Sequence, residues 1–125
     1  MPQYDKQWAL SYLKEGHAKE RVGDEFFQYT EDKNLIGIVS LIVDVSGVAE
    51  IRDEVVFSDY KEDPYRERMI GNIIEYARRL KLRKLFSLAT DEWVETYRSL
   101  GFEKEGALRD HFVEGENLTI MSKFL

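Results

Sequence analysis

The spacing of the apolar residues changes between residues 35 and 89, and this change limits the fold more than any other feature of the sequence. Ile, Leu and Val are dense at 35–43 and recur at 48–57, which is typical of β-strands. At 70–80 they recur every three or four residues with polar residues between them, as on one face of an α-helix. A second short apolar run follows at 85–89. This order predicts a mixed α/β domain with a central strand–helix–strand unit whose two strands pair in parallel.

The remaining segments predict further elements on both sides of this unit. Residues that favour turns and helix caps separate them, among them Asp32-Lys33-Asn34, Ser46-Gly47 and Gly101. We expect a helix at about 5–22, a short aromatic strand at 25–29, a helix at about 92–100, and a C-terminal hairpin of strands at 102–113 and 118–125. No repeat, low-complexity tract or linker interrupts the 125 residues, so we expect a single domain spanning residues 1–125.

The composition is that of an ordinary globular protein, with 43% hydrophobic and 34% charged residues. The chain has no apolar run near the ~20 residues that span a bilayer, and its first residues lack the pattern of a secretory signal. It has no cysteine, so we expect neither disulfides nor thiolate metal sites, and a cytoplasmic location is the simplest expectation. A net charge of −6 and a pI near 5.0 argue against nucleic acid as the main partner. The two histidines lie far apart and the acidic residues lack calcium-loop spacing, so no metal is implied.

The segment 63–72 joins the third predicted strand to the helix that follows. Such a helix start often binds an anion, because free backbone N–H groups and the helix dipole point at it. The segment contains Arg66, Arg68 and Gly71. We expect Gly71 in the first helical turn, where it costs about 1 kcal/mol relative to Ala. Either a phosphate or a neighbouring strand approaches Gly71 closely, or Gly71 relieves helix–sheet packing and the two arginines are solvated.

Two motifs resemble those of one enzyme family, the GCN5-related N-acetyltransferases. Residues 66–71, Arg-Glu-Arg-Met-Ile-Gly, are similar to its acetyl-CoA-binding motif, in which Gln or Arg is followed by two variable residues, Gly, one variable residue, and Gly or Ala. Met69 departs from this pattern, because the family usually has Gly there, and its side chain must point away from the pyrophosphate or clash with it. Residues 91–102 resemble the family's helix that ends in Tyr, three residues and Gly-Phe. Both motifs occur in the expected order and, with the elements around them, span roughly the last 90 residues.

The resemblance implies a mixed, mostly antiparallel sheet flanked by helices, with a shortened N-terminus, and acetyl-CoA as cosubstrate. It also implies the reaction, which is transfer of the acetyl group to a primary amine of a small molecule or peptide. The backbone of Val55, Val56 and Phe57 would pair with the pantetheine arm as though the arm were an added strand. The residues implied at the pyrophosphate are Arg66, Glu67, Arg68, Met69, Ile70, Gly71 and Asn72.

The resemblance also implies catalytic residues. Tyr97 matches the family tyrosine near the thioester sulfur and would protonate the leaving thiolate, although a tyrosine at a helix end is also typical of a core residue. Glu50 and Glu54 share one face of the strand by its two-residue period, and either resembles the strand glutamate that serves some family members as base. Both could equally be carboxylates that face water. His111, on the penultimate strand, is a further candidate base.

Two other functions remain open at this point. Met69 and the short N-terminus also fit a non-catalytic acyl-CoA-binding or regulatory module, and the motifs could be remnants in a structural or interaction domain. The net negative charge favours a cationic acceptor, and assembly as a homodimer stays open.

Overall fold

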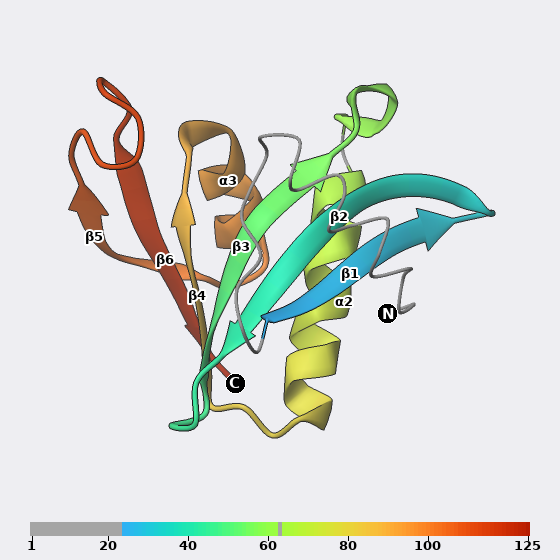
Figure 1. Cartoon of the computed structure of the whole chain (residues 1–125), viewed down its shortest axis with the longest axis horizontal. Helices are drawn as coiled ribbons and strands as arrows, with labels where there is room; N and C mark the ends of the chain where they lie inside the picture. The colour runs from blue at the N-terminus through green and yellow to red at the C-terminus, as the bar shows by residue number, and fades with distance from the viewer. Residues whose placement is uncertain (1–23, 63) are drawn as a thin grey trace.

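The computed structural model describes residues 24–62 and 64–125 of the chain. Within this part, six strands form one sheet in the order β1-β2-β3-β4-β6-β5 (Figure 1). The strands are β1 (Asp24–Glu31), β2 (Asn34–Val43), β3 (Val48–Val56), β4 (Lys84–Ala89), β5 (Glu103–Leu108) and β6 (Leu118–Phe124). The helices are α2 (Tyr65–Arg79), α3 (Asp91–Ser99) and a short 3-10 turn, η2 (Ser58–Tyr60). Only β3 and β4 pair in parallel, and every other pair in this sheet is antiparallel.

The predicted mixed, mostly antiparallel α/β fold is therefore confirmed. The strand–helix–strand unit is β3–α2–β4, and the strands predicted at 25–29, 35–43 and 85–89 are present to within two residues. The C-terminal hairpin is β5–β6. The helix predicted at 5–22 lies outside the described residues.

Two predicted positions are wrong. Helix α2 begins at Tyr65, so Gly71 lies in its second turn and not in its first. The first turn of α2 is only partly buried, and the apolar spacing that predicts the helix therefore starts one turn after the helix itself. Strand β5 ends at Leu108, so His111 lies in the exposed β5–β6 loop and not on a strand. The ladder with β6 ends at Leu108, and Asp110 in the loop beyond it has a left-handed φ of 52°.

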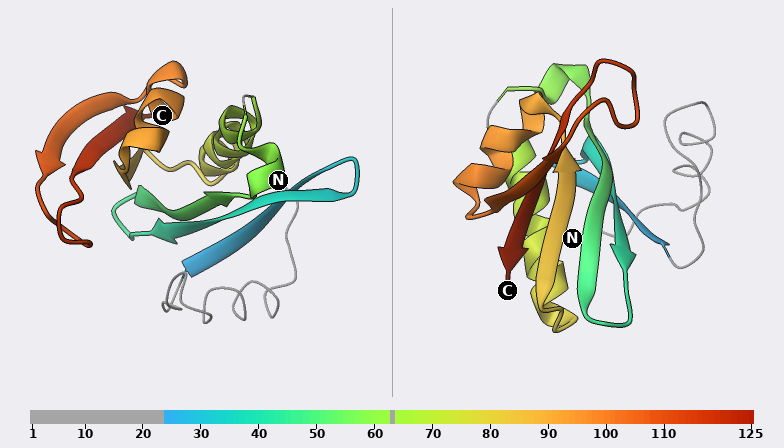
Figure 2. Two further views of the ribbon diagram at one scale, coloured as in Figure 1. Left: turned by 90° about the horizontal axis from the view of Figure 1, so that it is seen from above. Right: turned by 90° about the vertical axis from the view of Figure 1, so that its left-hand side faces the viewer.

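Helices α2 and α3 lie on the same face of the sheet (Figure 2, left). The core fills the space between α2 and the strands below it. Helix α2 contributes the buried residues Met69, Ile70, Ile73, Ile74 and Ala77, which follow its helical period. Helix α3 adds Trp93, Thr96 and Tyr97. The apolar pattern thus determines which side chains of both helices face the sheet. The packing of the helices in turn positions the loops that precede them.

Strand β3 contains a β-bulge. Ile38 pairs with Val55 and Ser40 with Arg52, so β3 has one more residue than β2 across this interval. Asp53, inside the bulge, has a φ of 56°, which lies in the left-handed region. A bulge shifts the alternation of side chains by one position. Residues Ile51 and Val56 are consequently both buried although they are five residues apart.

Strands β3 and β4 are paired over three residues each and then diverge (Figure 1). Their last paired residues are Glu50 and Phe86. Beyond this point the backbones of β3 and β4 form no hydrogen bonds with each other. On the far side of β3, the Phe57 N–H donates to the Ile36 carbonyl. Because backbone groups alternate along a strand, those of Val56 point away from β2 and toward the divergence. Within the described residues, this edge of β3 is therefore unpaired at Val56, close to the N-terminus of α2.

Candidate active site

Three polar side chains from three elements meet where β3 and β4 diverge: Glu54 from β3, Ser87 from β4 and Tyr97 from α3. The Ser87 hydroxyl donates a hydrogen bond to Glu54 Oε1 at 3.3 Å. Ser87 is 1% exposed and Tyr97 is fully buried. Sequence reasoning does not find Ser87, because a single serine on a short strand belongs to no motif. We call these three residues the polar cluster.

The environment of Glu54 suits it to exchange protons near neutral pH. Burial raises the pKa of Glu54 to about 7, and the negative charge of Asp53 adds to the rise. Its own backbone and the nearby hydroxyls of Tyr97 and Ser87 lower this pKa. A carboxyl group is most effective as a general base when its pKa lies near the working pH. Glu54 therefore has the properties that a general base requires.

We expect Glu54→Gln to stabilise the fold at alkaline pH. The folded pKa lies above the ordinary value of 4.5, so the native state binds more protons than the unfolded state between pH 4.5 and 7. Wild-type stability should therefore fall as the pH rises through this range, whereas the neutral glutamine is unaffected. The two proteins should be equally stable near pH 4, and the variant should be more stable at pH 8 by roughly 2 kcal/mol. The full shift would correspond to about 3.4 kcal/mol, but part of Glu54 is accessible to water.

Urea unfolding at both pH values measures this difference, and Glu105→Gln is the matched control. Lys84 and Ser122 hold the pKa of Glu105 below its usual range, so that carboxylate stabilises the fold when it is charged. Its replacement should therefore lower stability at pH 8, opposite in sign to Glu54→Gln. Equal stability of Glu54→Gln and wild type at pH 8 would mean that Glu54 is hydrated and not held as described.

The Tyr97 ring packs in the core, and its hydroxyl is buried near Glu54. Its ring packs against Trp93 and Phe102, with ring centroids 6.1 and 4.9 Å away. Among the described residues, its hydroxyl oxygen is buried and has no hydrogen-bond partner. Burial raises the pKa of Tyr97 well above 10, and the nearby Glu54 charge adds to the rise. An unpaired buried donor costs about 1–3 kcal/mol, and native structures contain few of them unless a ligand or water completes the bond. The Tyr97 ring is thus part of the core, as expected for a tyrosine at a helix end. Its hydroxyl is a candidate proton donor.

The bulge separates the two strand glutamates. Glu50 lies beside Phe86 in the β3–β4 register, and its carboxylate is 3.8 Å from the Arg52 guanidinium. Glu54 instead contacts Ser87, which neighbours Phe86 and so points to the other face of β4. The prediction that Glu50 and Glu54 share one face is therefore wrong, because the bulge at Asp53 interrupts the two-residue period. The structure brings Glu54 to Tyr97 and leaves Glu50 on the opposite face.

At the N-terminus of α2, several amides have no acceptor among the described residues. Its first N–H group with an acceptor in the helix is that of Arg68, which donates to the Pro64 carbonyl at 3.0 Å. The N-cap residue, Pro64, supplies no side-chain cap. The amides of residues 65–67 therefore have no acceptor within the helix. Free amides at the positive end of a helix dipole suit a phosphate group.

The two arginines of the motif already have partners. The Arg66 guanidinium donates to the Glu92 backbone carbonyl at 3.2 Å and lies 5.3 Å above the Trp93 ring. Arg68 pairs with Glu31 of β1 at 2.9 Å. These contacts tie the start of α2 to α3 and to β1. Any phosphate at this position would accordingly rely on the backbone amides more than on these two side chains.

Met69 points into the core. Its side chain is fully buried, and a Cβ added at Gly37 of β2 would lie 3.0 Å from the Met69 sulfur. The same Cβ would lie 2.2 Å from the Val55 carbonyl oxygen, so only glycine fits at position 37. Of the two orientations open to Met69, the structure has the one that avoids the helix N-terminus. The departure from the family pattern therefore does not block the free amides.

The other motif residues differ in their surroundings. Glu67 accepts a hydrogen bond from Ser99 at 3.2 Å, Ile70 is fully buried, and Asn72 donates to the Arg68 carbonyl at 2.8 Å. A Cβ at Gly71 would meet no protein atom within 4 Å. Packing among the described residues thus does not require glycine at position 71.

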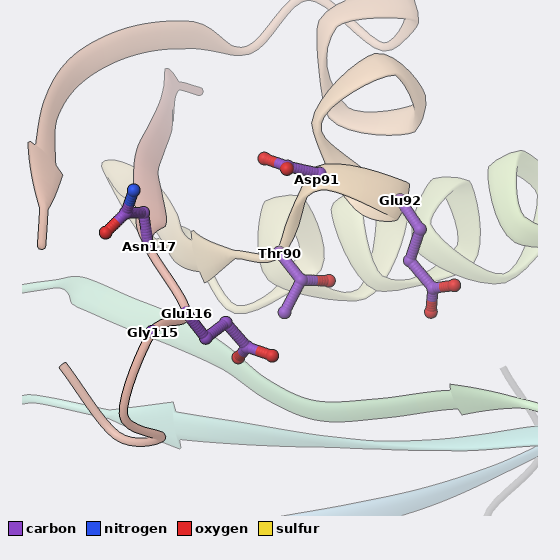
Figure 3. A pocket seen from close by; sticks show the side chains of 6 residues that line it. All are labelled: Thr90, Asp91, Glu92, Gly115, Glu116 and Asn117. Atoms are coloured by element: carbon purple, nitrogen blue, oxygen red, sulfur yellow. The ribbon is translucent and has the colours of Figure 1, made fainter. Parts of the chain in front are cut away.

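A pocket of about 570 Å³ lies at the start of α3. Thr90, Asp91 and Glu92 line one side, and the β5–β6 loop supplies the other. Figure 3 shows the Glu116 side chain directed toward Thr90 across the pocket. The lining from the loop is Gly115, Glu116 and Asn117. The lining holds three carboxylates, and that of Glu92 lies 3.5 Å from the Arg66 guanidinium. Asp91 and Glu116 leave the described lining with a negative charge that suits a cation.

His111, the further candidate base, does not belong to the polar cluster. It is exposed in the β5–β6 loop, and its ring contacts the Phe112 ring at 4.5 Å. Within residues 24–62 and 64–125, no three His, Cys, Asp or Glu side chains gather as a metal site would require. In the same part of the chain, no helix combines the length and apolar character needed to cross a membrane.

Comparisons with known proteins give matches in structure. No protein-family model matches the chain, and no curated protein matches its sequence. A spermidine N-acetyltransferase from Vibrio cholerae, in complex with CoA and spermine, is 22% identical; the match covers 99% of this chain and 78% of that one, with a TM-score of 0.75. A Bacillus subtilis acetyltransferase in complex with CoA is 15% identical, over 97% of this chain and 84% of that one, with a TM-score of 0.74.

A third solved structure carries the family name. It is a protein from Desulfovibrio desulfuricans assigned to the GNAT acetyltransferase family, which is 18% identical over 82% of this chain and 69% of that one, with a TM-score of 0.67. Identities this low establish a shared fold and leave activity to be argued from the site. The chain has the fold of the GCN5-related N-acetyltransferases, as the two sequence motifs predict.

Proposed function

We propose that the protein is an acetyl-CoA-dependent N-acetyltransferase that acetylates a primary amine of a small molecule or peptide. The observation that carries this proposal is the buried Tyr97 hydroxyl beside Glu54, which has no hydrogen-bond partner in the described part of the chain, at the point where β3 and β4 diverge. A proton donor and a proton acceptor are what acetyl transfer from a thioester to an amine requires. The proposal is supported by the fold, since its structural neighbours include acetyltransferases in complex with CoA.

The residues that would hold acetyl-CoA belong to the end of β3 and the start of α2. The backbone at the end of β3, Val55 and Val56, and the following Phe57 would pair with the pantetheine arm, mainly through the outward-facing groups of Val56. The free amides of residues 65–67 would bind the pyrophosphate, and Gly71 would let it approach the helix. Both features meet near the short segment that joins β3 to α2.

In the proposed reaction, Glu54 and Tyr97 of the polar cluster act as base and acid. Glu54 takes a proton from the amine, the nitrogen forms a bond to the acetyl carbon, and the carbon–sulfur bond breaks. Tyr97 gives a proton to the departing sulfur, so one proton moves in total from nitrogen to sulfur. This balance holds for a neutral amine. The acidic pocket at the start of α3 favours an acceptor that is positively charged in solution, which must first release one further proton to the solvent. Glu50, on the opposite face of β3, has no part in this proposal.

We expect CoA and acetyl-CoA to raise the thermal midpoint of the wild-type protein. Ligand at 100 times its Kd stabilises the native state by about 2.7 kcal/mol, which corresponds to several degrees for a chain of this size. Gly71→Asp should lose most of this shift, because it places a negative charge where the resemblance puts the pyrophosphate. Gly71→Asn, nearly identical in shape but neutral, is the matched control and should keep it. Both variants should fold, since no described atom from outside the local helical turn lies within 4 Å of the added Cβ.

Release of free thiol from acetyl-CoA separates an enzyme from a binding module. The acceptors to be tried are polyamines, amino acids, aminoglycosides and peptide N-termini. Thiol release with one of them, dependent on the protein, would support the acetyltransferase. Tight CoA binding with no release from any acceptor would favour the non-catalytic acyl-CoA-binding module. An equal CoA-induced thermal shift in Gly71→Asp and Gly71→Asn would show that the pyrophosphate does not bind near Gly71.

A further inference from the structure

We propose that Ser87 is a positioning residue for the acetyl transfer: its hydroxyl holds the Glu54 carboxylate where β3 and β4 diverge and favours its ionised form. This inference rests on the proposed function, because it gives Ser87 a part in preparing the base of that reaction. Ser87 belongs to neither sequence motif. It acts through Glu54 and not on the substrate.

The two residues meet where the strands have stopped pairing. Strands β3 and β4 pair only as far as Glu50 and Phe86, and both Glu54 and Ser87 come after these positions in their strands. The Ser87 hydroxyl donates to Glu54 Oε1 at 3.3 Å, so a side-chain hydrogen bond joins the strands beyond the end of their ladder. A glutamate side chain is long and rotates about several bonds, and an anchor at its carboxyl end limits the orientations it can adopt.

The position of Ser87 in its strand is itself informative. Strand β4 alternates buried and half-buried residues, and its buried positions are Leu85, Ser87 and Ala89. A core-facing position between two apolar residues is normally apolar, because a buried hydroxyl without a partner is costly. In this structure the Ser87 hydroxyl is paired with Glu54. The contact with Glu54 therefore gives a reason for a hydroxyl at this position that strand packing does not supply.

Glu54 benefits from a hydrogen-bond donor because burial opposes its charge. Burial is the main cause that raises the pKa of Glu54 to about 7, and the neighbouring Asp53 adds to the rise. The hydroxyls of Tyr97 and Ser87 lower this pKa, but that of Tyr97 has no hydrogen-bond partner among the described residues. Ser87 is thus the hydroxyl whose geometry fits a bond to the carboxylate. A donor to the charged form keeps more of Glu54 ionised near neutral pH, as a general base requires.

The test compares Ser87→Ala and Ser87→Thr with the wild type, using the full chain and a proven acceptor. The amine titrates identically in every assay, so the ratio of the kcat/KM values of variant and wild type reports on the enzyme. For Ser87→Ala this ratio should be lower at pH 6 by ~3- to 10-fold, since one pKa unit changes the ionised fraction by up to a factor of ten. The loss should be smaller at pH 9, where Glu54 is ionised in both proteins. Ser87→Thr restores the hydroxyl and should recover most of the rate at pH 6.

Ser122→Ala is the matched control. Ser122 of β6 is 4% exposed, and its hydroxyl donates to Glu105 Oε1 at 2.7 Å, so it also joins a buried serine to a strand glutamate. Glu105 has no part in the proposed reaction. Ser122→Ala should therefore leave kcat/KM unchanged at both pH values. Thermal midpoints establish that each variant is folded, and the CoA thermal shift should be the same in all of them.

A second measurement does not depend on activity. Titration of the Glu54 carboxyl carbon, followed by NMR and assigned by its absence in Glu54→Gln, reports the pKa directly. This pKa should rise in Ser87→Ala and return toward the wild-type value in Ser87→Thr. The other titratable groups that act on it are Asp53 of β3 and Tyr97 of α3, and neither is altered in these variants. A serine that only filled space would leave the titration unmoved.

The outcomes separate the role of Ser87 from the proposed function. An active wild type with the same pH dependence and the same Glu54 titration in Ser87→Ala would overturn the positioning role and leave the acetyltransferase standing. A rate loss that is equal at pH 6 and pH 9, with an unmoved titration, would also overturn it and indicate a packing role. A wild type that releases no thiol with any acceptor would overturn the proposed function, and the catalytic part of Ser87 with it. A loss that is larger at pH 6, together with a raised Glu54 pKa, would establish the positioning role.

Discussion

Tyr97→Phe is expected to lower acetyl transfer by at least ~10-fold while leaving CoA binding unchanged. General acid catalysis contributes typically ~100- to 10,000-fold, and the substitution removes only the hydroxyl that would protonate the sulfur. That hydroxyl is buried and has no partner among the described residues, so its loss should not cost stability. Removing an unpaired buried polar group should leave the free energy of unfolding unchanged or raise it by about 1 kcal/mol. Initial rates of thiol release, CoA thermal shifts and urea unfolding measure the three quantities.

Tyr29→Phe is the matched control for this experiment. Tyr29 is also buried, but its hydroxyl donates to Glu31 at 2.5 Å, on the edge strand β1. Its replacement should lower stability by about 1 kcal/mol and leave the rate unchanged, which is the opposite of Tyr97→Phe in both respects. Full activity of Tyr97→Phe with a proven acceptor would assign protonation of the sulfur to water and not to this tyrosine.

Met69→Gly is expected to destabilise the protein strongly and not to tighten CoA binding. The family pattern alone predicts tighter binding, because glycine is usual at this position. Met69 is however fully buried against Gly37, so its removal empties part of the core. Truncation of a buried methionine to alanine costs about 2–5 kcal/mol, and glycine within a helix costs about 1 kcal/mol more. We therefore expect a loss on the order of 4 kcal/mol in urea unfolding.

Met69→Leu is the control that keeps the volume of this side chain. Swaps of similar volume in a core usually cost less than about 1.5 kcal/mol, and the CoA thermal shift should match that of the wild type. If Met69→Gly were as stable as wild type and bound CoA more tightly, Met69 would face the ligand and not the core. The two variants together thus test the direction of one side chain.

The sequence predicts the fold well where neighbours along the chain decide the structure. Alternating and helical spacing depend on residues two to four positions apart, and these patterns correctly predict β1 to β4 and the body of α2. The two motifs correctly predict the family fold, because they depend on residue order around a strand, a helix and a turn. They also single out Tyr97, whose hydroxyl the structure leaves buried and unpaired.

What the tertiary structure alone decided is which side chains meet. The bulge at Asp53 depends on the pairing of β3 with β2, and it turns Glu54 toward Ser87 and away from the face of Glu50. Arg66 and Arg68 find partners 26 and 37 residues away, Glu92 and Glu31, which no local pattern reveals.

Tertiary structure also decides the role of Met69, which departs from the family motif. Its side chain fits into the core because β2 has glycine opposite it. The sequence by itself determined the elements and their order, since these follow from short-range spacing and propensity. The site was decided by contacts between elements, because the burial and charge that set the properties of Glu54 and Tyr97 exist only once β3, β4 and α3 have packed together.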